Sequence, residues 1–177
     1  MFFPDTYRFP KGTSDLDFLQ RAFQVMQSHL TREWDQRDVD LPLESKYEAL
    51  ILASIIEKET GAGFERPLIS GVFVRRLKKN MRLQTDPTII YGLGEKFDGD
   101  IRFRDLKKDT PYNTYLHAGL TPTPIALPGL EAIRAALHPA KTDALYFVSK
   151  GDGTHQFSAT LDEHNTAVRR YQLNTAK

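Results

Sequence analysis

The sequence predicts an α+β fold that is mainly helical and carries one small β-hairpin. Apolar residues recur at the three- and four-residue spacing of amphipathic helices along much of the chain. Two short runs with strand character instead flank Gly151-Asp152-Gly153, a sequence typical of a tight turn. Several helices with a single hairpin indicate a mainly helical α+β domain.

Composition indicates an ordinary globular domain. The chain has 177 residues, 40% hydrophobic and 27% charged, so it can bury the core of a single domain over residues 1–177. A formal net charge of +1 implies no general attraction to nucleic acid. The lack of cysteine excludes disulfides, cysteine-ligated metals and thiol nucleophiles. No apolar run approaches the roughly 20 residues needed to span a bilayer.

The first predicted helix is long and follows an extended opening segment. Thr13 or Ser14 is a suitable N-cap, and apolar residues at helical spacing continue from there to about Arg37. Leu41-Pro42-Leu43 then breaks the pattern, because proline cannot continue a helix interior. We therefore expect one helix that begins after Thr13 or Ser14 and ends at about Arg37.

Two further helices follow in the first half of the chain. Ser45 is the expected N-cap of the second helix, with Glu48 three residues later completing a capping box. Gly61 or Gly63 ends that helix. The third helix is predicted over Glu65 to Lys79, where apolar residues again line one face.

The second half of the chain contains shorter elements and one long loop. Asp109 to Pro128 is rich in Thr, Pro, Gly and Tyr without a clean period, and structureless segments of this length are often functional. The other expected elements are a helix near Pro87 to Tyr91, a turn at Phe103 to Leu106, a helix over Gly129 to Leu137, strands at Ala144 to Ser149 and His155 to Ser158, and a final helix over Leu161 to Leu173.

A glutamate continues the apolar stripe of the second helix. Leu52, Ile55 and Ile56 share one helical face, and the next position on that face is Glu59. A carboxyl group in such a position loses part of its hydration, which raises its pKa. A carboxylic acid that keeps its proton near neutral pH can act as a general acid.

Glu57 is the rival catalytic candidate on the same helix. It lies two residues from Glu59 and therefore points about 100–200° away around the helix axis, so only one of the two can face a given cleft. Glu57 lies on a less apolar face, which favours a structural salt bridge with an arginine of the third helix. In the simplest alternative, both glutamates are ordinary helix-end charges, solvated or paired with Lys58.

Other common active-site patterns are missing from the sequence. It contains neither a P-loop nor a Gly-x-Ser-x-Gly elbow, and its five histidines show no tight metal-ligand spacing. We therefore predict no metal site. The basic residues clustered between Arg75 and Arg82 are expected to form the solvated face of a helix.

Two segments combine amides, hydroxyls and phenols in the way carbohydrate sites do. Gln84-Thr85-Asp86-Pro87 precedes a predicted helix, and Tyr112-Asn113-Thr114-Tyr115 places an amide between two phenols. Amides pair with sugar hydroxyl and acetamido groups, and aromatic faces pack against sugar rings. The alternatives are a helix cap and turn for the first segment and a rigid surface loop for the second.

These motifs, in this order, resemble the catalytic domain of the endolytic murein transglycosylases, the YceG-like family. The resemblance covers nearly the whole chain from Phe3-Pro4-Asp5-Thr6-Tyr7 onward. Its main pieces are Leu52-Ala53-Ser54-Ile55-Ile56-Glu57-Lys58-Glu59-Thr60, Met81-Arg82-Leu83-Gln84-Thr85-Asp86-Pro87-Thr88, Tyr112-Asn113-Thr114-Tyr115, Ile125-Ala126-Leu127-Pro128-Gly129, His138-Pro139-Ala140-Lys141-Thr142 and Leu145-Tyr146-Phe147-Val148.

The resemblance implies a lysozyme-like catalytic domain that cleaves the MurNAc-(β1,4)-GlcNAc bond inside peptidoglycan strands. It assigns the catalytic glutamate to Glu59 and implies neither a metal nor a cofactor. By their place in the matched motifs, Gln84, Asn113 and Tyr115 are expected to bind or orient the glycan. Asp86 is a candidate second carboxylate, although its place before a proline favours capping.

The resemblance also carries expectations about the cell. Family members are normally tethered to the inner membrane by one N-terminal helix, with the catalytic part in the periplasm or outside the cell. They usually carry a LysM-like module before that part, and this chain contains neither the helix nor the module. The expected role is to terminate nascent glycan strands near the peptidoglycan synthases.

Two other functional classes stay open on the sequence. A lysozyme-type muramidase would use the same fold but add water, giving reducing ends in place of anhydro ends. A peptidoglycan-binding or scaffold domain would recruit partners without chemistry, and its function would survive Glu59→Gln.

Overall fold

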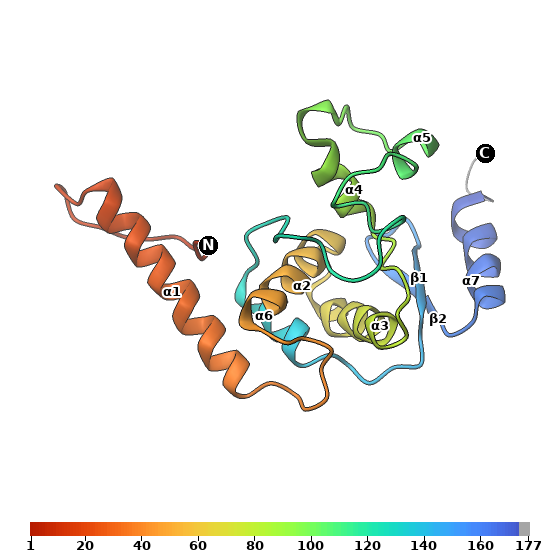
Figure 1. Cartoon of the computed structure of the whole chain (residues 1–177), viewed down its shortest axis with the longest axis horizontal. Helices are drawn as coiled ribbons and strands as arrows, with labels where there is room; N and C mark the ends of the chain where they lie inside the picture. The colour runs from red at the N-terminus through yellow and green to blue at the C-terminus, as the bar shows by residue number, and fades with distance from the viewer. Residues whose placement is uncertain (174–177) are drawn as a thin grey trace.

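A computed structural model describes residues 1–173, so the last four positions of the predicted domain lie outside the described residues. The elements, in chain order, are α1 (Asp15–Asp35), α2 (Lys46–Glu59), η1 (Gly63–Glu65), α3 (Arg66–Lys78), α4 (Asp86–Leu93), η2 (Gly94–Lys96), α5 (Phe103–Leu106), α6 (Leu130–Leu137), β1 (Tyr146–Ser149), β2 (His155–Ser158), α7 (Leu161–Val168) and η3 (Arg169–Leu173). The predicted mainly helical α+β class is confirmed (Figure 1).

Helix α2 lies at the centre of the molecule, packed against α3 and α6 (Figure 1). Every residue from 49 to 56 is buried, so α2 is enclosed on all sides. A helix that is apolar around its whole circumference is typical of a core position. The predicted stripe of Leu52, Ile55 and Ile56 is confirmed, since all three are completely buried.

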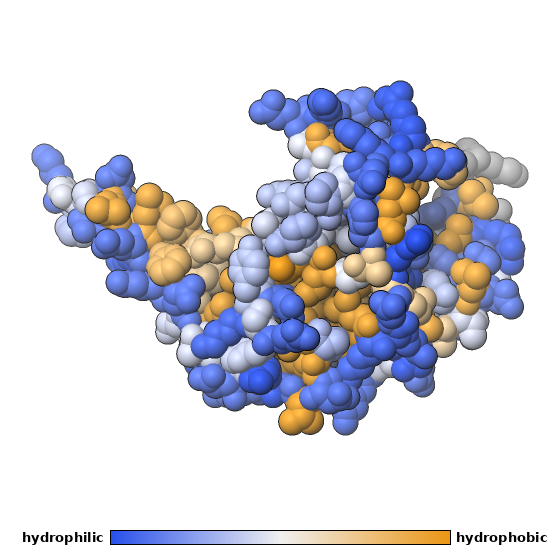
Figure 2. Space-filling view, in the orientation of Figure 1, coloured by the Kyte–Doolittle hydropathy of each residue, from blue (hydrophilic) through white to orange (hydrophobic). Residues whose placement is uncertain are grey.

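Helix α1 forms an arm that leaves the body of the molecule at its N-terminal end (Figure 1). Ser14 is its N-cap and forms a capping box with Asp17, and the helix ends two residues before the predicted limit of Arg37. Met26 and Leu30 anchor it in the core, whereas Figure 2 shows hydrophobic side chains exposed along its outer end. No helix within residues 1–173 is long and apolar enough to cross a bilayer.

The predicted hairpin is confirmed: β1 begins two residues later than predicted, at Tyr146, and β2 has the predicted bounds. β1 and β2 pair antiparallel so that Phe147 faces Phe157, and the turn contains Gly151 and Gly153 at φ values of 84° and 86°. Such positive φ values favour glycine, since a Cβ atom would crowd the backbone there. Phe147 also meets Phe73 of α3 edge to face, which joins the hairpin to the helical core.

A long loop over residues 107–129 joins α5 to α6, as the composition predicted. One buried hydroxyl attaches this loop to the central helix. Ser54 Oγ of α2 donates to the carbonyl of Ile51 at 2.7 Å and accepts the backbone N–H of Ile125 at 2.9 Å. Because Ser54 is completely buried, no water can replace this bond.

Ser54→Ala is expected to destabilise the fold. The substitution leaves the buried N–H of Ile125 without a partner, which costs about 1–3 kcal/mol. Urea denaturation monitored by circular dichroism measures this loss as a lower transition midpoint.

Ser70→Ala is the matched control. Ser70 lies in α3, is equally buried, and its hydroxyl has no hydrogen-bond partner among the described residues. Both changes replace serine by alanine inside a helix, so helix propensity contributes equally. Ser70→Ala is expected to be neutral or stabilising, and equal destabilisation by the two variants would contradict the role of Ser54.

Candidate active site

Glu59, the last residue of α2, lines a cleft of about 490 Å³. The walls of this cleft come from α2, α3, α4, the loop that contains Tyr115, both strands and α7. The lining side chains mix charged, amide, hydroxyl and aromatic groups, which is the composition that sugar ligands require. Glu59 and Tyr115 therefore lie in one cleft although they are far apart in the sequence.

The environment of Glu59 keeps its carboxyl group protonated to unusually high pH. The pKa of Glu59 is raised to about 7, first because burial removes hydration from the carboxylate and second because of the nearby negative charge of Asp86. A hydrogen bond from Thr85 and the positive charge of Arg76 act in the opposite direction. A group that is half protonated near neutral pH suits both proton donation and proton acceptance.

Thr85 holds the carboxyl group of Glu59 in one orientation. Its hydroxyl donates to Glu59 Oε2 at 2.6 Å, and Thr85 itself is 1% exposed. Its backbone N–H donates to Thr114 Oγ1 at 3.1 Å, and its carbonyl accepts the hydroxyl of Thr88 at 2.7 Å. Thr88 and Thr114 also bond to each other at 2.8 Å, so three threonines fix the position of this donor.

Asp86 contacts Tyr115 and does not cap α4, which corrects the expectation of a capping role. The phenol of Tyr115 donates to Asp86 Oδ1 at 2.6 Å. Burial, the hydrogen bond and the charge of Asp86 all raise the pKa of Tyr115, so the phenol stays neutral and acts as a donor. Asp86 thereby remains a fixed negative charge close to Glu59.

Gln84 and Tyr115 both line the cleft, and the side chain of Gln84 is exposed. Its backbone has a φ of 49°, a left-handed conformation that is uncommon for residues other than glycine. The backbone N–H of Gln84 donates to the carbonyl of Thr114 at 3.1 Å, which holds this conformation against the loop. Such strain is a recurrent feature of functional sites.

Asn113 does not line the cleft, and its expected role of binding or orienting the glycan stays a prediction. The side chain is 1% exposed and is fully engaged within its own loop. Its amide N–H groups donate to the carbonyls of Leu106 and Lys108, and its amide oxygen accepts the backbone N–H of Tyr115 at 2.9 Å. Asn113 therefore fixes the loop that presents Tyr115.

The prediction that the basic residues of α3 form a solvated face is wrong for Arg76. Its side chain turns inward from α3, is 7% exposed, and donates to the carbonyls of Leu145 at 2.6 Å and Leu83 at 2.8 Å. Lys78 and Lys79 remain exposed, as expected. Arg76 lines the cleft, so its charge reaches Glu59.

Glu57 makes the structural ion pair that the sequence predicted. Its carboxylate meets Arg66 of α3 at 3.3 Å and accepts the backbone N–H of Gly129, the N-cap of α6, at 3.0 Å. Through these contacts the carboxylate of Glu57 is engaged on another side of α2, and Glu57 does not line the cleft. The predicted salt bridge with an arginine of the third helix is confirmed.

Two histidines also line the cleft, and the sequence did not single them out. His155 of β2 pairs with Glu65, and His164 of α7 stacks on Tyr146 with ring centroids 5.2 Å apart. Their separation in sequence carries no motif, because the hairpin and α7 bring them together only after folding. Within residues 1–173, no group of three His, Asp or Glu side chains could hold a metal ion.

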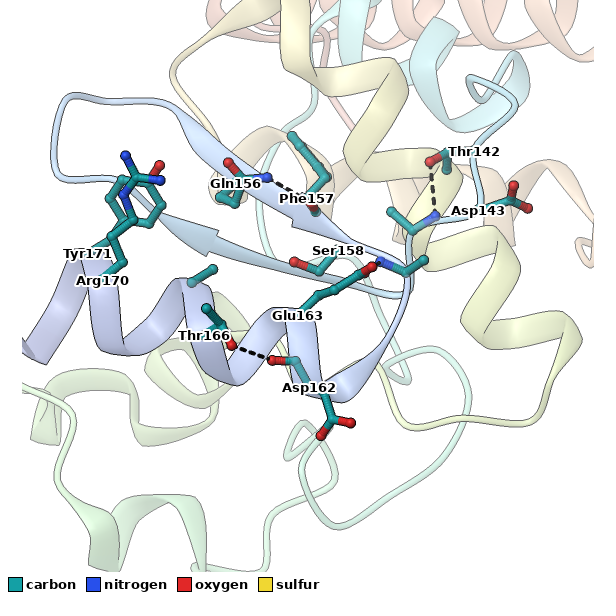
Figure 3. Close-up of a pocket in the computed structure, with 13 residues that line it drawn as sticks. Thr142, Asp143, Gln156, Phe157, Ser158, Asp162, Glu163, Thr166, Arg170 and Tyr171 are labelled. Atoms are coloured by element: carbon teal, nitrogen blue, oxygen red, sulfur yellow. Dashed lines mark hydrogen bonds between the residues drawn. The ribbon is translucent and has the colours of Figure 1, made fainter.

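A larger recess lies elsewhere, between β2, α7 and residues 142–144, with a volume of about 830 Å³ (Figure 3). Three acidic residues line it, Asp143, Asp162 and Glu163, and Glu163 is already used, since Oε2 accepts the backbone N–H groups of Ala159 and Thr160 at the start of α7. Size alone therefore does not identify the site. We place it at Glu59, where a perturbed carboxyl group lies in a cleft beside converging polar groups.

Comparison with known proteins identifies the family of the chain. The sequence model of the YceG-like family matches residues 1–170. The chain belongs to the YceG-like family. The resemblance that the motifs indicated is thereby confirmed.

The chain is similar to proteins named endolytic murein transglycosylase in two bacteria. The Bacillus subtilis protein is 42% identical over 169 residues, which are 96% of this chain and 46% of that protein. The Streptococcus pneumoniae protein is 30% identical over 175 residues, again 96% of this chain but 31% of that protein. The chain thus spans less than half the length of these relatives.

A crystal structure is also similar. A YceG-like protein from Listeria monocytogenes superposes with a TM-score of 0.80 at 39% sequence identity, over 93% of this chain and 53% of that one. A TM-score of this size shows that the two proteins share the fold.

Glu59→Gln is expected to stabilise the fold more at pH 8 than at pH 5. The ordinary pKa of 4.5 applies in the unfolded chain, whereas the folded value is about 7. Between these values the unfolded state releases its proton first, so the wild type loses about 3 kcal/mol of stability as pH rises. Glutamine does not titrate and avoids this loss.

Urea denaturation of both proteins across pH 5 to 8 measures the difference. The advantage of Glu59→Gln should grow through this window. A difference that stays constant with pH would mean that the folded carboxyl group titrates at its ordinary value.

Proposed function

We propose that this chain is the catalytic domain of an endolytic murein transglycosylase. It cleaves the MurNAc-(β1,4)-GlcNAc bond within peptidoglycan strands and leaves 1,6-anhydroMurNAc ends. The main support for this proposal is that the carboxyl group of Glu59 lies in an open polar cleft and has a pKa of about 7, which suits a general acid. The names of the similar bacterial proteins support the same activity.

Glu59 acts twice in the proposed reaction. Its proton passes first to the glycosidic oxygen, the bond to C1 of MurNAc breaks, and an oxocarbenium-like state forms. The 6-hydroxyl of the same MurNAc then attacks C1 and closes the 1,6-anhydro ring. The Glu59 carboxylate takes the proton of that hydroxyl, so one residue serves as acid and then as base.

Neighbouring residues prepare this carboxyl group and the substrate. Thr85 fixes the oxygen Oε2, which leaves the other oxygen of Glu59 free to face the glycan. Gln84 and Tyr115 are assigned to glycan binding from the cleft wall. Asn113 is assigned to positioning Tyr115, since its amide groups are used within the loop.

A muramidase is the second candidate, because a second carboxylate lies close to Glu59. The charge of Asp86 is near enough to raise the pKa of Glu59, and hydrolysis needs a group that activates water. The bond from Tyr115 occupies one oxygen of Asp86, which disfavours this role. A scaffold that only binds peptidoglycan gives no reason for a carboxyl group with a raised pKa.

The cellular setting is also part of the proposal. We place this domain, residues 1–177, in the periplasm of a longer protein held in the inner membrane by one N-terminal helix. There it would terminate nascent glycan strands beside peptidoglycan synthases. The greater length of the similar bacterial proteins supports such additional segments.

Glu59→Gln is expected to abolish the release of anhydro ends. Glutamine cannot donate a proton to the glycosidic oxygen, so the cleavage rate should fall by about 10²–10⁴-fold. Mass spectrometry of muropeptides after incubation with purified sacculi identifies the product ends.

Glu57→Gln is the matched control, because it makes the same change on the same helix outside the cleft. It is expected to keep cleavage activity at some loss of stability. Reducing ends from the wild type would identify a hydrolase and point to Asp86. Equal product from the wild type and Glu59→Gln would refute Glu59 as the acid.

Two substitutions should move the pH dependence of cleavage in opposite directions. Thr85→Val removes the hydrogen bond that lowers the pKa of Glu59, so the fall in kcat/KM with rising pH should begin at higher pH. Asp86→Asn removes the negative charge that raises this pKa, so the fall should begin at lower pH.

The pH profiles of both variants and the wild type on soluble glycan strands provide the measurement. The wild-type profile should fall as pH rises through about 7, because Glu59 then loses its acidic proton. Shifts of both variants in the same direction would show that Glu59 does not control the alkaline limb.

A further inference from the structure

Glu65 and His155 form a largely buried pair, and His155 lines the cleft. Glu65 ends η1 and is 6% exposed, and both of its carboxylate oxygens contact the same residue. Oε1 accepts the backbone N–H of His155 at 2.9 Å, and Oε2 meets His155 Nδ1 at 2.7 Å. The backbone bond alone would attach the hairpin, so the second bond controls the imidazole ring.

This second bond decides which ring nitrogen carries the proton. A carboxylate only accepts hydrogen bonds, so Nδ1 carries the hydrogen that points to Oε2. In the neutral ring, Nε2 then has a free lone pair and acts as an acceptor. Glu65 thus sets both the orientation and the tautomer of His155, as carboxylates do for histidines elsewhere.

The other edge of the ring is available to a ligand. His155 lines the same cleft as Glu59, and its Nε2 has no hydrogen-bond partner within residues 1–173. Nε2 is not one of the buried polar atoms that lack a hydrogen bond within residues 1–173, so this edge of the ring is accessible. The rings of Phe147 and Phe157 meet the imidazole at centroid distances of 5.4 and 6.4 Å and prevent it from turning.

We propose that His155 is a further substrate-binding residue, whose Nε2 accepts a hydrogen bond from a hydroxyl or acetamido N–H of the aminosugar, and that Glu65 is its positioning residue. This inference rests on the proposed function for the identity of the ligand. His155 would add a glycan contact from the hairpin, whereas Gln84 and Tyr115 lie on other segments of the chain.

Glu65→Gln tests the proposal because it should reverse the tautomer without breaking the pair. The backbone N–H of His155 can only donate, so it must face the oxygen of the new amide. The amide NH₂ then faces Nδ1 and donates to it. Nδ1 becomes the acceptor, the ring proton moves to Nε2, and the cleft meets a donor in place of an acceptor.

The expected result is a fall in kcat/KM on soluble glycan strands of at least about tenfold, with an unchanged melting temperature. Nitrogen-15 NMR of the His155 ring should show the proton on Nδ1 in the wild type and on Nε2 in Glu65→Gln. Wild-type kcat/KM in a variant whose tautomer has reversed would overturn the proposal. A merely structural pair predicts that result, since both hydrogen bonds persist.

His155→Phe provides a second, independent variant. It keeps an aromatic ring against Phe147 and Phe157 but removes Nε2. If Glu65 acts through His155, adding Glu65→Gln to His155→Phe should lower kcat/KM no further. Additive losses in the double variant would show that Glu65 acts by another route.

Binding separates this proposal from the proposed function. In Glu59→Gln protein, soluble glycan strands should shift the His155 Nε2 resonance whether or not the wild type cleaves them. Glycan binding without that shift would overturn the role of His155 and leave the proposed function standing. An absence of both binding and cleavage would overturn both proposals.

Discussion

The structure depends on the partial burial of one carboxyl group at the end of an apolar helix. Helix α2 is enclosed along its length, and this enclosure brings Glu59 to the edge of the core. Lost hydration disfavours the charged form, and the surroundings compensate only in part. The fold thereby gives up stability at neutral pH to keep this carboxyl group protonated, as the proposed role of Glu59 requires.

The groups around Glu59 balance its protonated form against its ionised form. Thr85 and Arg76 favour the carboxylate, whereas burial and Asp86 favour the acid. Tyr115 fixes Asp86, and Asn113 fixes the loop of Tyr115, so the charge that acts on Glu59 is itself held in place. A single residue that serves as acid and then base requires such a balance, since neither state can be strongly preferred.

Local patterns predicted the parts of the site that lie within one element. The stripe ending in Glu59 and the position of Glu57 on a different face of the helix follow from helical spacing, which the chain determines locally. Arg76 could not be predicted, because its partners are carbonyl groups brought near by the fold. Asn113 has a polar side chain suited to sugars, yet its own loop uses it. His155 reaches the cleft only through hairpin pairing.

The central claim is that folding raises the pKa of Glu59 to about 7. Carbon-13 NMR titration of the glutamate side-chain carboxyl groups, with Glu59→Gln to assign the resonance, measures this value directly. A midpoint near pH 7 for the Glu59 resonance is the predicted result. A midpoint near the ordinary value of 4.5 would mean that Glu59 is ionised at neutral pH, and would contradict its role as the general acid.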